Sequence, residues 1–211
     1  RALKMHGGVE KEDLKKENLD ALKKGLPNLE RHINNVKKFG IELVVAINHF
    51  ITDTDKEVKL IQEYCSKFGV KVSLCTHWSD GGKGTEDLAK NVVEACKKNN
   101  KENFKYLYKD ETPILKKVET IAKEIYGASG IEFDDKVKEQ VNIIEKSGFS
   151  KFPVCIAKTQ YSFSTDPKLK GAPSGHTLPI REVRLSSGAE FVVVVCGAIM
   201  TMPGLPKVPA A

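Results

Sequence analysis

Apolar and polar residues form two kinds of pattern along this chain, one typical of helices and one typical of buried strands. In residues 10–39, apolar positions recur every three or four residues, which predicts helix. Gly25-Leu26-Pro27 interrupts this pattern. Because proline suits the first turn of a helix and not its interior, we expect two consecutive helices or a kink there. Gly40 stands where a glycine would end the second helix.

The segment Ile41–Ile47, apolar except for Glu42, predicts a strand buried on both faces of a parallel sheet, and Val70–Cys75 predicts the next strand. Between them, Thr54-Asp55-Lys56-Glu57 has the form of a capping box and predicts a helix that ends at Phe68-Gly69. A further helix is expected over residues 85–98. Its inward face is predicted to carry Leu88, Val92, Val93 and Cys96. This order of elements is typical of an α/β sheet with right-handed crossovers.

The pattern changes near residue 110. Helices are predicted over 113–126 and 134–146, separated by a break at 127–130, and strands over 152–157, 178–185 and 190–196. We therefore predict two parts. Residues 1–110 form an α/β part, and residues 111–211 form a smaller α+β domain.

Composition narrows the possible functions. The chain has 211 residues and a net charge of +6, but its lysines are interleaved with acidic residues, which is typical of solvated helix faces. No basic stripe with aromatics is present, so we expect no nucleic-acid partner, whereas a modest positive field suits an anionic small substrate. No apolar run approaches the roughly 18 residues of a membrane span, so no membrane role is expected.

The five cysteines lie far apart without a CxxC pair or a metal-ligand spacing. The odd count argues against a disulfide framework and for a reducing compartment, and we expect a cytoplasmic protein with no metal site of its own.

Polar and aromatic side chains follow both predicted strands of the first part. Asn48, Phe50 and Asp53 come after the first strand, and Trp78, the only tryptophan, comes after the second. Ligands of open α/β sheets bind at the carboxyl ends of the strands, so we predict a slot in which Phe50 and Trp78 stack on a flat heterocycle. The alternative is a local role, in which Asn48 and Asp53 bond only to nearby backbone.

Gly81-Gly82-Lys83-Gly84 follows Trp78 directly and precedes a helix. Backbone N–H groups in such a loop can form an anion nest, so Gly81, Gly82 and Gly84 are candidate binding residues. A plain flexible turn is the alternative, and the segment is not a P-loop because GxxxxGK[ST] is missing. No serine triad, carboxylate pair or cysteine–histidine nucleophile can be assembled, so we predict no catalytic residue in this chain.

Several motifs together resemble the formate–tetrahydrofolate ligases. In chain order, these motifs are Arg1-Ala2-Leu3-Lys4-Met5-His6-Gly7-Gly8, Asn48-x-Phe50-x-Thr52-Asp53-Thr54, Trp78-x-x-Gly81-Gly82-x-Gly84, Lys158-Thr159-Gln160-Tyr161-Ser162-Phe163-Ser164 and Met202-Pro203-Gly204-Leu205-Pro206. The resemblance covers essentially the whole chain. It implies that residues 1–110 are the carboxy-terminal part of a nucleotide- and folate-binding domain with a P-loop NTPase-like parallel sheet.

The resemblance further implies an ATP-dependent ligation in which formate becomes formyl phosphate and N10 of tetrahydrofolate then attacks the formyl carbon. Mg²⁺ accompanies ATP, a monovalent cation such as K⁺ assists, and the enzyme is commonly a homotetramer. The aromatic pair that sandwiches the folate ring maps onto Phe50 and Trp78.

One departure matters for function. The family's P-loop lies in an amino-terminal half that this chain lacks, so we expect that half as a partner and predict that the 211 residues alone have no ligase activity. The alternative function is a non-catalytic module in which Asn48, Phe50 and Asp53 read a purine nucleotide.

Overall fold

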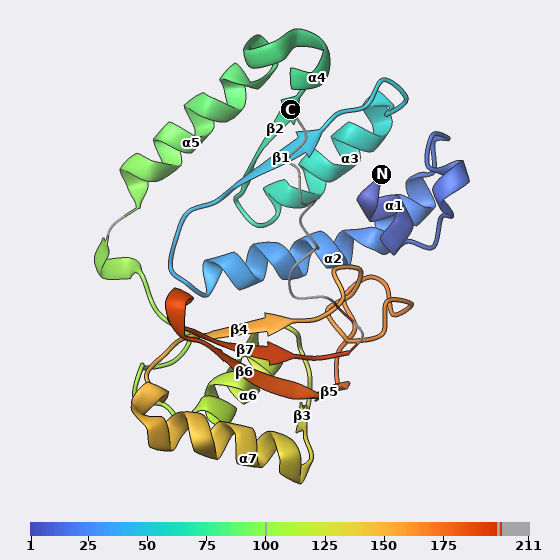
Figure 1. The fold of residues 1–211 in the computed structure, drawn as a ribbon. Coiled ribbons are helices and arrows are strands. Elements are labelled where there is room, and N and C mark those ends of the chain that lie inside the picture. Colours follow the sequence, from blue (N-terminus) through green and yellow to red (C-terminus); the bar gives the residue numbers. More distant parts are fainter. Residues whose placement is uncertain (100, 198, 200–211) are drawn as a thin grey trace, which may run out of the picture. The chain divides into compact units, whose positions relative to one another are not determined.

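A computed structural model describes residues 1–99, 101–197 and 199, and the chain divides into two compact units (Figure 1). Unit 1 comprises Arg1–Leu107 with Lys170–Ala172, and unit 2 comprises Tyr108–Leu169 with the residues from Pro173 onward. Both units combine helices with small, mostly parallel sheets, so the predicted α/β class is confirmed. Among the described residues, no helix combines the length and the apolar character needed to cross a bilayer.

Unit 1 is built around a pair of parallel strands. Its elements are α1 (Ala2–His6), α2 (Leu19–Lys37), β1 (Val44–Asn48), α3 (Asp55–Ser66), β2 (Lys71–Cys75), α4 (His77–Asp80) and α5 (Glu86–Lys98), with 3-10 turns at Lys11–Asp13, Gly81–Thr85 and Lys101–Asn103. In the β1–β2 register Asn48 lies opposite Cys75, and the His49 N–H donates to the Cys75 carbonyl at 3.0 Å. The two strands therefore end level, and the loops that follow them start side by side.

The two faces of this sheet are covered differently. On one face Ile33 of α2 and Cys65 of α3 are buried together with Val70. On the other, α5 reaches the sheet through polar groups, because Ser73 Oγ donates to Asp87 at 2.6 Å and accepts from Asn91 at 2.8 Å. The prediction that Val92, Val93 and Cys96 of α5 point inward is wrong, because these side chains are exposed. Leu88, the fourth residue of that predicted face, is half-buried.

Of the two alternatives predicted at Gly25-Leu26-Pro27, two separate helices are wrong, since α2 continues through Pro27, and the kink stays a prediction. Pro27 lies on the exposed side of the helix, where water can satisfy the carbonyl that loses its N–H partner. Gly25 has a packing role instead. A Cβ on Gly25 would lie 1.8 Å from the Leu3 carbonyl oxygen of α1, and one on Gly7 would lie 1.8 Å from the Ala21 carbonyl oxygen of α2. These glycines allow α1 and α2 to touch backbone to backbone.

Unit 2 packs two helices against one face of a sheet. Its elements are α6 (Ile114–Glu124), β3 (Gly130–Glu132), α7 (Asp135–Ile144), a π-helical turn (Glu145–Phe149), β4 (Val154–Ala157), β5 (Thr177–Pro179), β6 (Glu182–Ser186), a 3-10 turn (Ser187–Ala189) and β7 (Phe191–Val195). The strands form a β4–β7–β6 sheet and a separate parallel β3–β5 pair. The single strand predicted over 178–185 is therefore wrong, and β3 lies where a helix break was expected.

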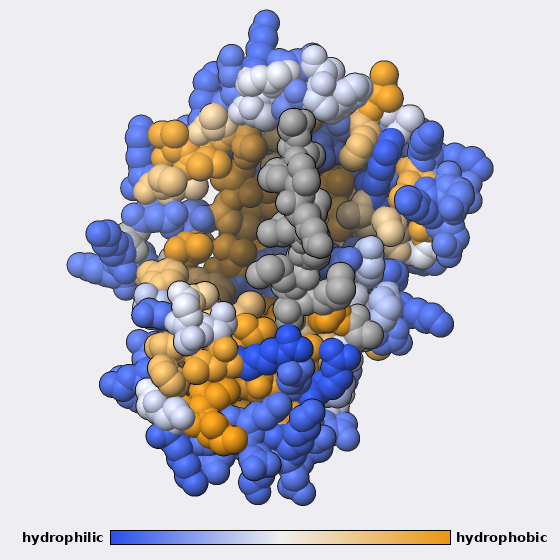
Figure 2. Space-filling model, in the orientation of Figure 1, coloured by the Kyte–Doolittle hydropathy of each residue, from blue (hydrophilic) through white to orange (hydrophobic). Residues whose placement is uncertain are grey.

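The core of unit 2 is continuous. Val118 of α6, Val137 of α7, Leu178 of β5 and Val192 and Val194 of β7 are all fully buried in one cluster. The opposite face of β7 carries the exposed Phe191, and Figure 2 shows hydrophobic residues gathered over these strands.

Candidate functional site

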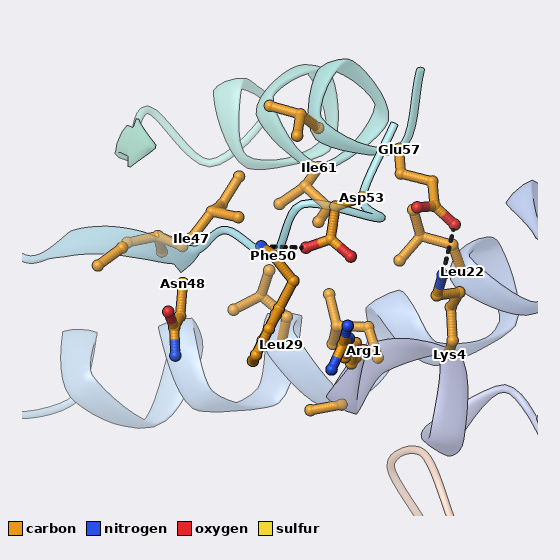
Figure 3. A pocket seen from close by; sticks show the side chains of 15 residues that line it. Arg1, Lys4, Leu22, Leu29, Ile47, Asn48, Phe50, Asp53, Glu57 and Ile61 are labelled. Atoms are coloured by element: carbon orange, nitrogen blue, oxygen red, sulfur yellow. Dashed lines mark hydrogen bonds and ion pairs between the residues drawn. The ribbon is translucent and has the colours of Figure 1, made fainter. Parts of the chain in front are cut away.

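A cavity of about 330 Å³ opens at the carboxyl end of β1 (Figure 3). Its walls come from α1, α2, β1, α3 and the β1–α3 loop. Most of the lining is aliphatic, but it includes three of the residues singled out in the sequence, Asn48, Phe50 and Asp53. Such a mostly apolar hollow with few polar groups is typical of a small-molecule site.

Phe50 supplies an aromatic wall, and one of its faces is already covered. The Arg1 guanidinium carbon lies 3.8 Å from the centroid of the Phe50 ring. Arg1 is held there because its Nη2 donates to Thr52 Oγ1 at 3.0 Å. A stacked ligand must therefore use the other face of Phe50 or displace Arg1.

Asp53 has one local bond and one unused oxygen. Its Oδ2 accepts from the Phe50 N–H at 3.0 Å, and its own N–H donates to the Phe50 carbonyl at 2.8 Å. Its Oδ1 is buried without a hydrogen-bond partner among the described residues. Asp53 thus has the local role that the sequence left open, and its ligand role stays a prediction. Asn48 is exposed at the carboxyl end of β1.

A buried ion pair forms the deep end of the cavity. Lys4 Nζ lies 2.8 Å from Glu57 Oε1, and their side chains are only 2% and 5% exposed. Lys4 also donates to the Lys16 carbonyl at 2.9 Å, and Glu57 accepts from the Asn18 N–H at 3.1 Å. Burial alone would raise the pKa of Glu57, but the hydrogen bonds from Lys4, Asn18 and Thr54 outweigh it and lower that pKa.

Trp78 does not line the cavity, but it is tied to the same strand end. Its indole Nε1 donates to the His49 carbonyl at 2.8 Å, immediately before Phe50 in the chain. The Trp78 side chain is 55% exposed, so its ring is open to solvent. The second aromatic is thus anchored to the β1 loop by a hydrogen bond that the sequence pattern did not reveal.

The glycine-rich segment forms a 3-10 turn whose glycines differ in their roles. Gly81 has φ +57°, which favours glycine. A Cβ on Gly84 would lie 2.7 Å from Thr76 Oγ1, and the Thr76 N–H donates to the Gly84 carbonyl at 3.1 Å. Gly82 is exposed with open space around it. Gly81 and Gly84 therefore have structural reasons to be glycine, and the anion nest stays a prediction.

Within the described ranges, no three His, Cys, Asp or Glu side chains lie together in a way that could hold a metal ion.

In unit 2, Lys158 of the Lys158–Ser164 segment donates to the Thr159 and Ser162 carbonyls and lies 4.7 Å from the Tyr126 ring centroid. Burial lowers the pKa of Lys158.

Comparison with known proteins gives the family. The family model described as formate–tetrahydrofolate ligase matches residues 1–211. The formate–tetrahydrofolate ligase of Pelagibacter ubique is 64% identical over 211 residues, which are 100% of this chain and 37% of that protein. Those of Roseobacter denitrificans and Beijerinckia indica are 58% and 59% identical over the whole chain, which covers 38% of each.

The chain belongs to the formate–tetrahydrofolate ligase family. The resemblance inferred from the sequence motifs is thereby confirmed. The chain spans less than two fifths of the length of these relatives, at 37% to 38%.

Three charged residues of the cavity were not predicted as site residues, namely Arg1, Lys4 and Glu57. Each carried a signal in the sequence: Arg1 and Lys4 open the first family motif, and Glu57 completes the capping box. Helix periodicity could not show that α1 packs against α2 and borders the same cavity as β1.

Proposed function

We propose that this chain is part of an ATP-dependent formate–tetrahydrofolate ligase and supplies the slot for the folate ring. In this proposal Phe50 and Trp78 stack on the pterin, and Asn48 and Asp53 bond to its edge. Gly81, Gly82 and Gly84 shape the neighbouring loop. The family membership supports the reaction class, and the cavity at the end of β1 supports the location.

The observation that carries this location is the bond from Trp78 Nε1 to the His49 carbonyl at 2.8 Å. It tethers the second aromatic to the residue before Phe50, although the two loops follow different strands. A bound ring therefore meets both loops at one end of a parallel sheet, where ligands of α/β sheets bind.

The remaining chemistry lies outside these residues. We propose a sheet of P-loop NTPase type that is completed by an amino-terminal half, which holds ATP with Mg²⁺ and forms formyl phosphate. A monovalent cation assists, and the complete enzyme is a cytoplasmic homotetramer. Aromatic stacking contributes about 0.5–1.5 kcal/mol per pair, which cannot replace phosphate positioning. The 211 residues alone should therefore have no ligase activity, and turnover by the purified chain would contradict this.

A second candidate is a purine-nucleotide-binding module without catalysis. The favouring observation is that Asn48, Phe50 and Asp53 converge on one cavity at a strand end. A purine could use the same stacking face and the same Asp53 oxygen. In this case nucleotide binding does not require Trp78.

The sole tryptophan makes a direct test possible, because fluorescence of the 211-residue chain reports only on Trp78. We expect tetrahydrofolate to quench this fluorescence saturably and ADP to have little effect. Replacing Phe50 with Ala should weaken tetrahydrofolate binding about tenfold. Trp78→Ala, followed by calorimetry, should weaken binding similarly.

The opposite pattern, with saturable ADP binding that does not depend on Trp78, would favour the purine module. Phe191→Ala is a suitable control, since it removes an exposed aromatic from unit 2 and should leave binding unchanged.

A further inference from the structure

A short segment late in the chain, Lys170–Ala172, belongs to unit 1, whereas the residues directly before and after it belong to unit 2. We call this segment the strap. Its central residue, Gly171, is buried and has φ +73°, a backbone conformation that favours glycine. The strap lies in the loop between β4 and β5, so hydrogen bonds outside helices and strands must hold it in place.

These hydrogen bonds join the strap to α1 and to α2. The Gly171 N–H donates to His6 Nδ1 of α1 at 3.1 Å. The Gly171 carbonyl accepts from Asn28 Nδ2 of α2 at 2.9 Å, in a buried bond, and the Ala172 carbonyl accepts from Arg31 Nη2 of α2 at 3.1 Å. Both backbone polar groups of Gly171 are therefore used, and the strap connects the two helices.

The same two helices form walls of the cavity at the end of β1. Figure 3 shows Arg1 and Lys4 at α1 and Leu22 and Leu29 of α2 around it. The residues that bind the strap are not among the described residues that line the cavity, so the strap joins α1 and α2 outside it. Because α1 has only five residues and such short helices are marginal by themselves, its position depends on tertiary contacts.

The acceptor in the bond between α1 and the strap is titratable. His6 Nδ1 can accept only while it carries no proton, and protonation would set its N–H against the Gly171 N–H. Burial, followed by the nearby charges of Lys170 in the strap and of His32 in α2, lowers the pKa of His6 below 6.5. Arg31 of α2 adds a further positive charge at the strap. The bond is therefore present above 6.5 and is lost as the pH falls through the lowered pKa.

We propose that His6 and the strap are positioning elements of the cavity, because the bond from the Gly171 N–H to His6 Nδ1 holds α1 where Arg1 and Lys4 form its wall. This inference rests on the proposed function. His6 and Gly171 do not touch the ligand, and they act on its affinity through α1. Loss of the bond should consequently weaken tetrahydrofolate binding without changing the aromatic slot.

The first test measures tetrahydrofolate affinity of the 211-residue chain by Trp78 fluorescence, at pH values above and below 6.5. The unaltered chain should bind about 3- to 10-fold more weakly at acidic pH, as expected for one lost hydrogen bond. His6→Ala should bind that weakly at both pH values. His6→Asn places a non-titrating acceptor, Oδ1, near the position of Nδ1 and should keep the affinity at both. Comparing variants at the same pH cancels any change in the ligand itself.

The second test alters the strap without touching α1. Gly171→Ala introduces backbone strain at φ +73°, although open space surrounds the added Cβ, and should weaken binding by a similar factor. Gly175→Ala is the matched control. Gly175 has φ +74° and equally open space, but it lies in unit 2 outside the strap, so its replacement should leave the affinity unchanged.

The outcomes distinguish this inference from the proposed function. If the unaltered chain binds tetrahydrofolate, and His6→Ala keeps its circular dichroism spectrum and its affinity, the role of the strap is overturned while the proposed function stands. A pH dependence that persists in His6→Asn, or that disappears in His32→Asn, overturns it equally. If His6→Ala does not fold, unchanged affinity of Gly171→Ala overturns it. If the unaltered chain does not bind tetrahydrofolate, the proposed function and this inference both fail.

Discussion

Unit 2 carries a hydrophobic core of its own, whereas unit 1 has a small core and a polar interior. In unit 2, buried side chains from α6, α7 and the strands form one cluster. In unit 1 the cluster between the helices and the sheet has Ile33, Cys65 and Val70 buried. Leu22 and Leu26 of α2 are buried outside this cluster, as is a charged pair, Lys4 and Glu57. The described part of α5 buries none of its residues.

This difference indicates how the two units are stabilised. Apolar burial stabilises unit 2 without directional requirements, while unit 1 depends on specific polar contacts around a cavity. A pocket that accepts a ligand cannot be filled with side chains, and here the Lys4–Glu57 ion pair and the hydrogen bond from the Phe50 N–H to Asp53 fix part of its mostly aliphatic wall. The unit with the weaker core is therefore the one that carries the candidate site.

The largest effect is expected from breaking the buried ion pair of unit 1. Lys4→Met leaves Glu57 charged and buried without its partner, and should lower the free energy of unfolding by about 3–5 kcal/mol. Urea denaturation measures this. The matched control is Lys116→Met in unit 2, where the pair with Glu119 is exposed and the loss should stay below about 1 kcal/mol. Equal losses would refute the contrast between the units.

A somewhat smaller effect should follow from a cavity in the core of unit 2. Leu178 is fully buried, so Leu178→Ala should cost about 2–5 kcal/mol in the free energy of unfolding. In unit 1, Leu74 is 37% exposed, and Leu74→Ala should cost much less. Thermal unfolding of the two variants compares them directly. A larger cost at Leu74 would mean that the sheet of unit 1 is better packed than its exposure indicates.

The smallest effect concerns the pH dependence of unit 1. His6 Nδ1 accepts from the Gly171 N–H at 3.1 Å, and burial, with Lys170 and His32 nearby, lowers the pKa of His6 below 6.5. Because the folded state binds the proton less readily than the unfolded state, this contribution is complete above 6.5 and is lost as the pH falls through the lowered pKa.

The free energies of unfolding of the unaltered chain and of His6→Gln, measured as the pH falls below 6.5, should therefore diverge, and that of the variant should depend less on pH. Proton NMR of the His6 ring measures the pKa directly. A His6 resonance that titrates above the ordinary value would reverse the sign of this prediction.

Much of the fold was predictable from local pattern. The capping box starts α3 at Thr54, and the apolar segments predicted β1 and β2 within a few residues. The predicted burial of the first strand on both faces is wrong, since Ala46 and Asn48 of β1 are exposed. The failures share one cause, which is contact between distant segments. Gly25 was part of a predicted interruption of the helical pattern, yet it lies inside α2, where the lack of a Cβ allows the backbone of α1 to pack closely. One strand was predicted over residues 178–185, yet Leu178 pairs with Ile131 of β3 and Val183 with Val194 of β7.

By itself, the sequence determined the family, the α/β character and the aromatic and polar residues at two strand ends, because these depend on residue order and on periodicity along a single element. Only the tertiary structure decided which of them share a cavity. It placed Arg1 on the ring of Phe50, buried Lys4 against Glu57, and left one oxygen of Asp53 without a partner in the part of the chain that the structure describes. The physical reason is that burial and pairing of a polar atom depend on segments far away in the chain, which no local pattern encodes.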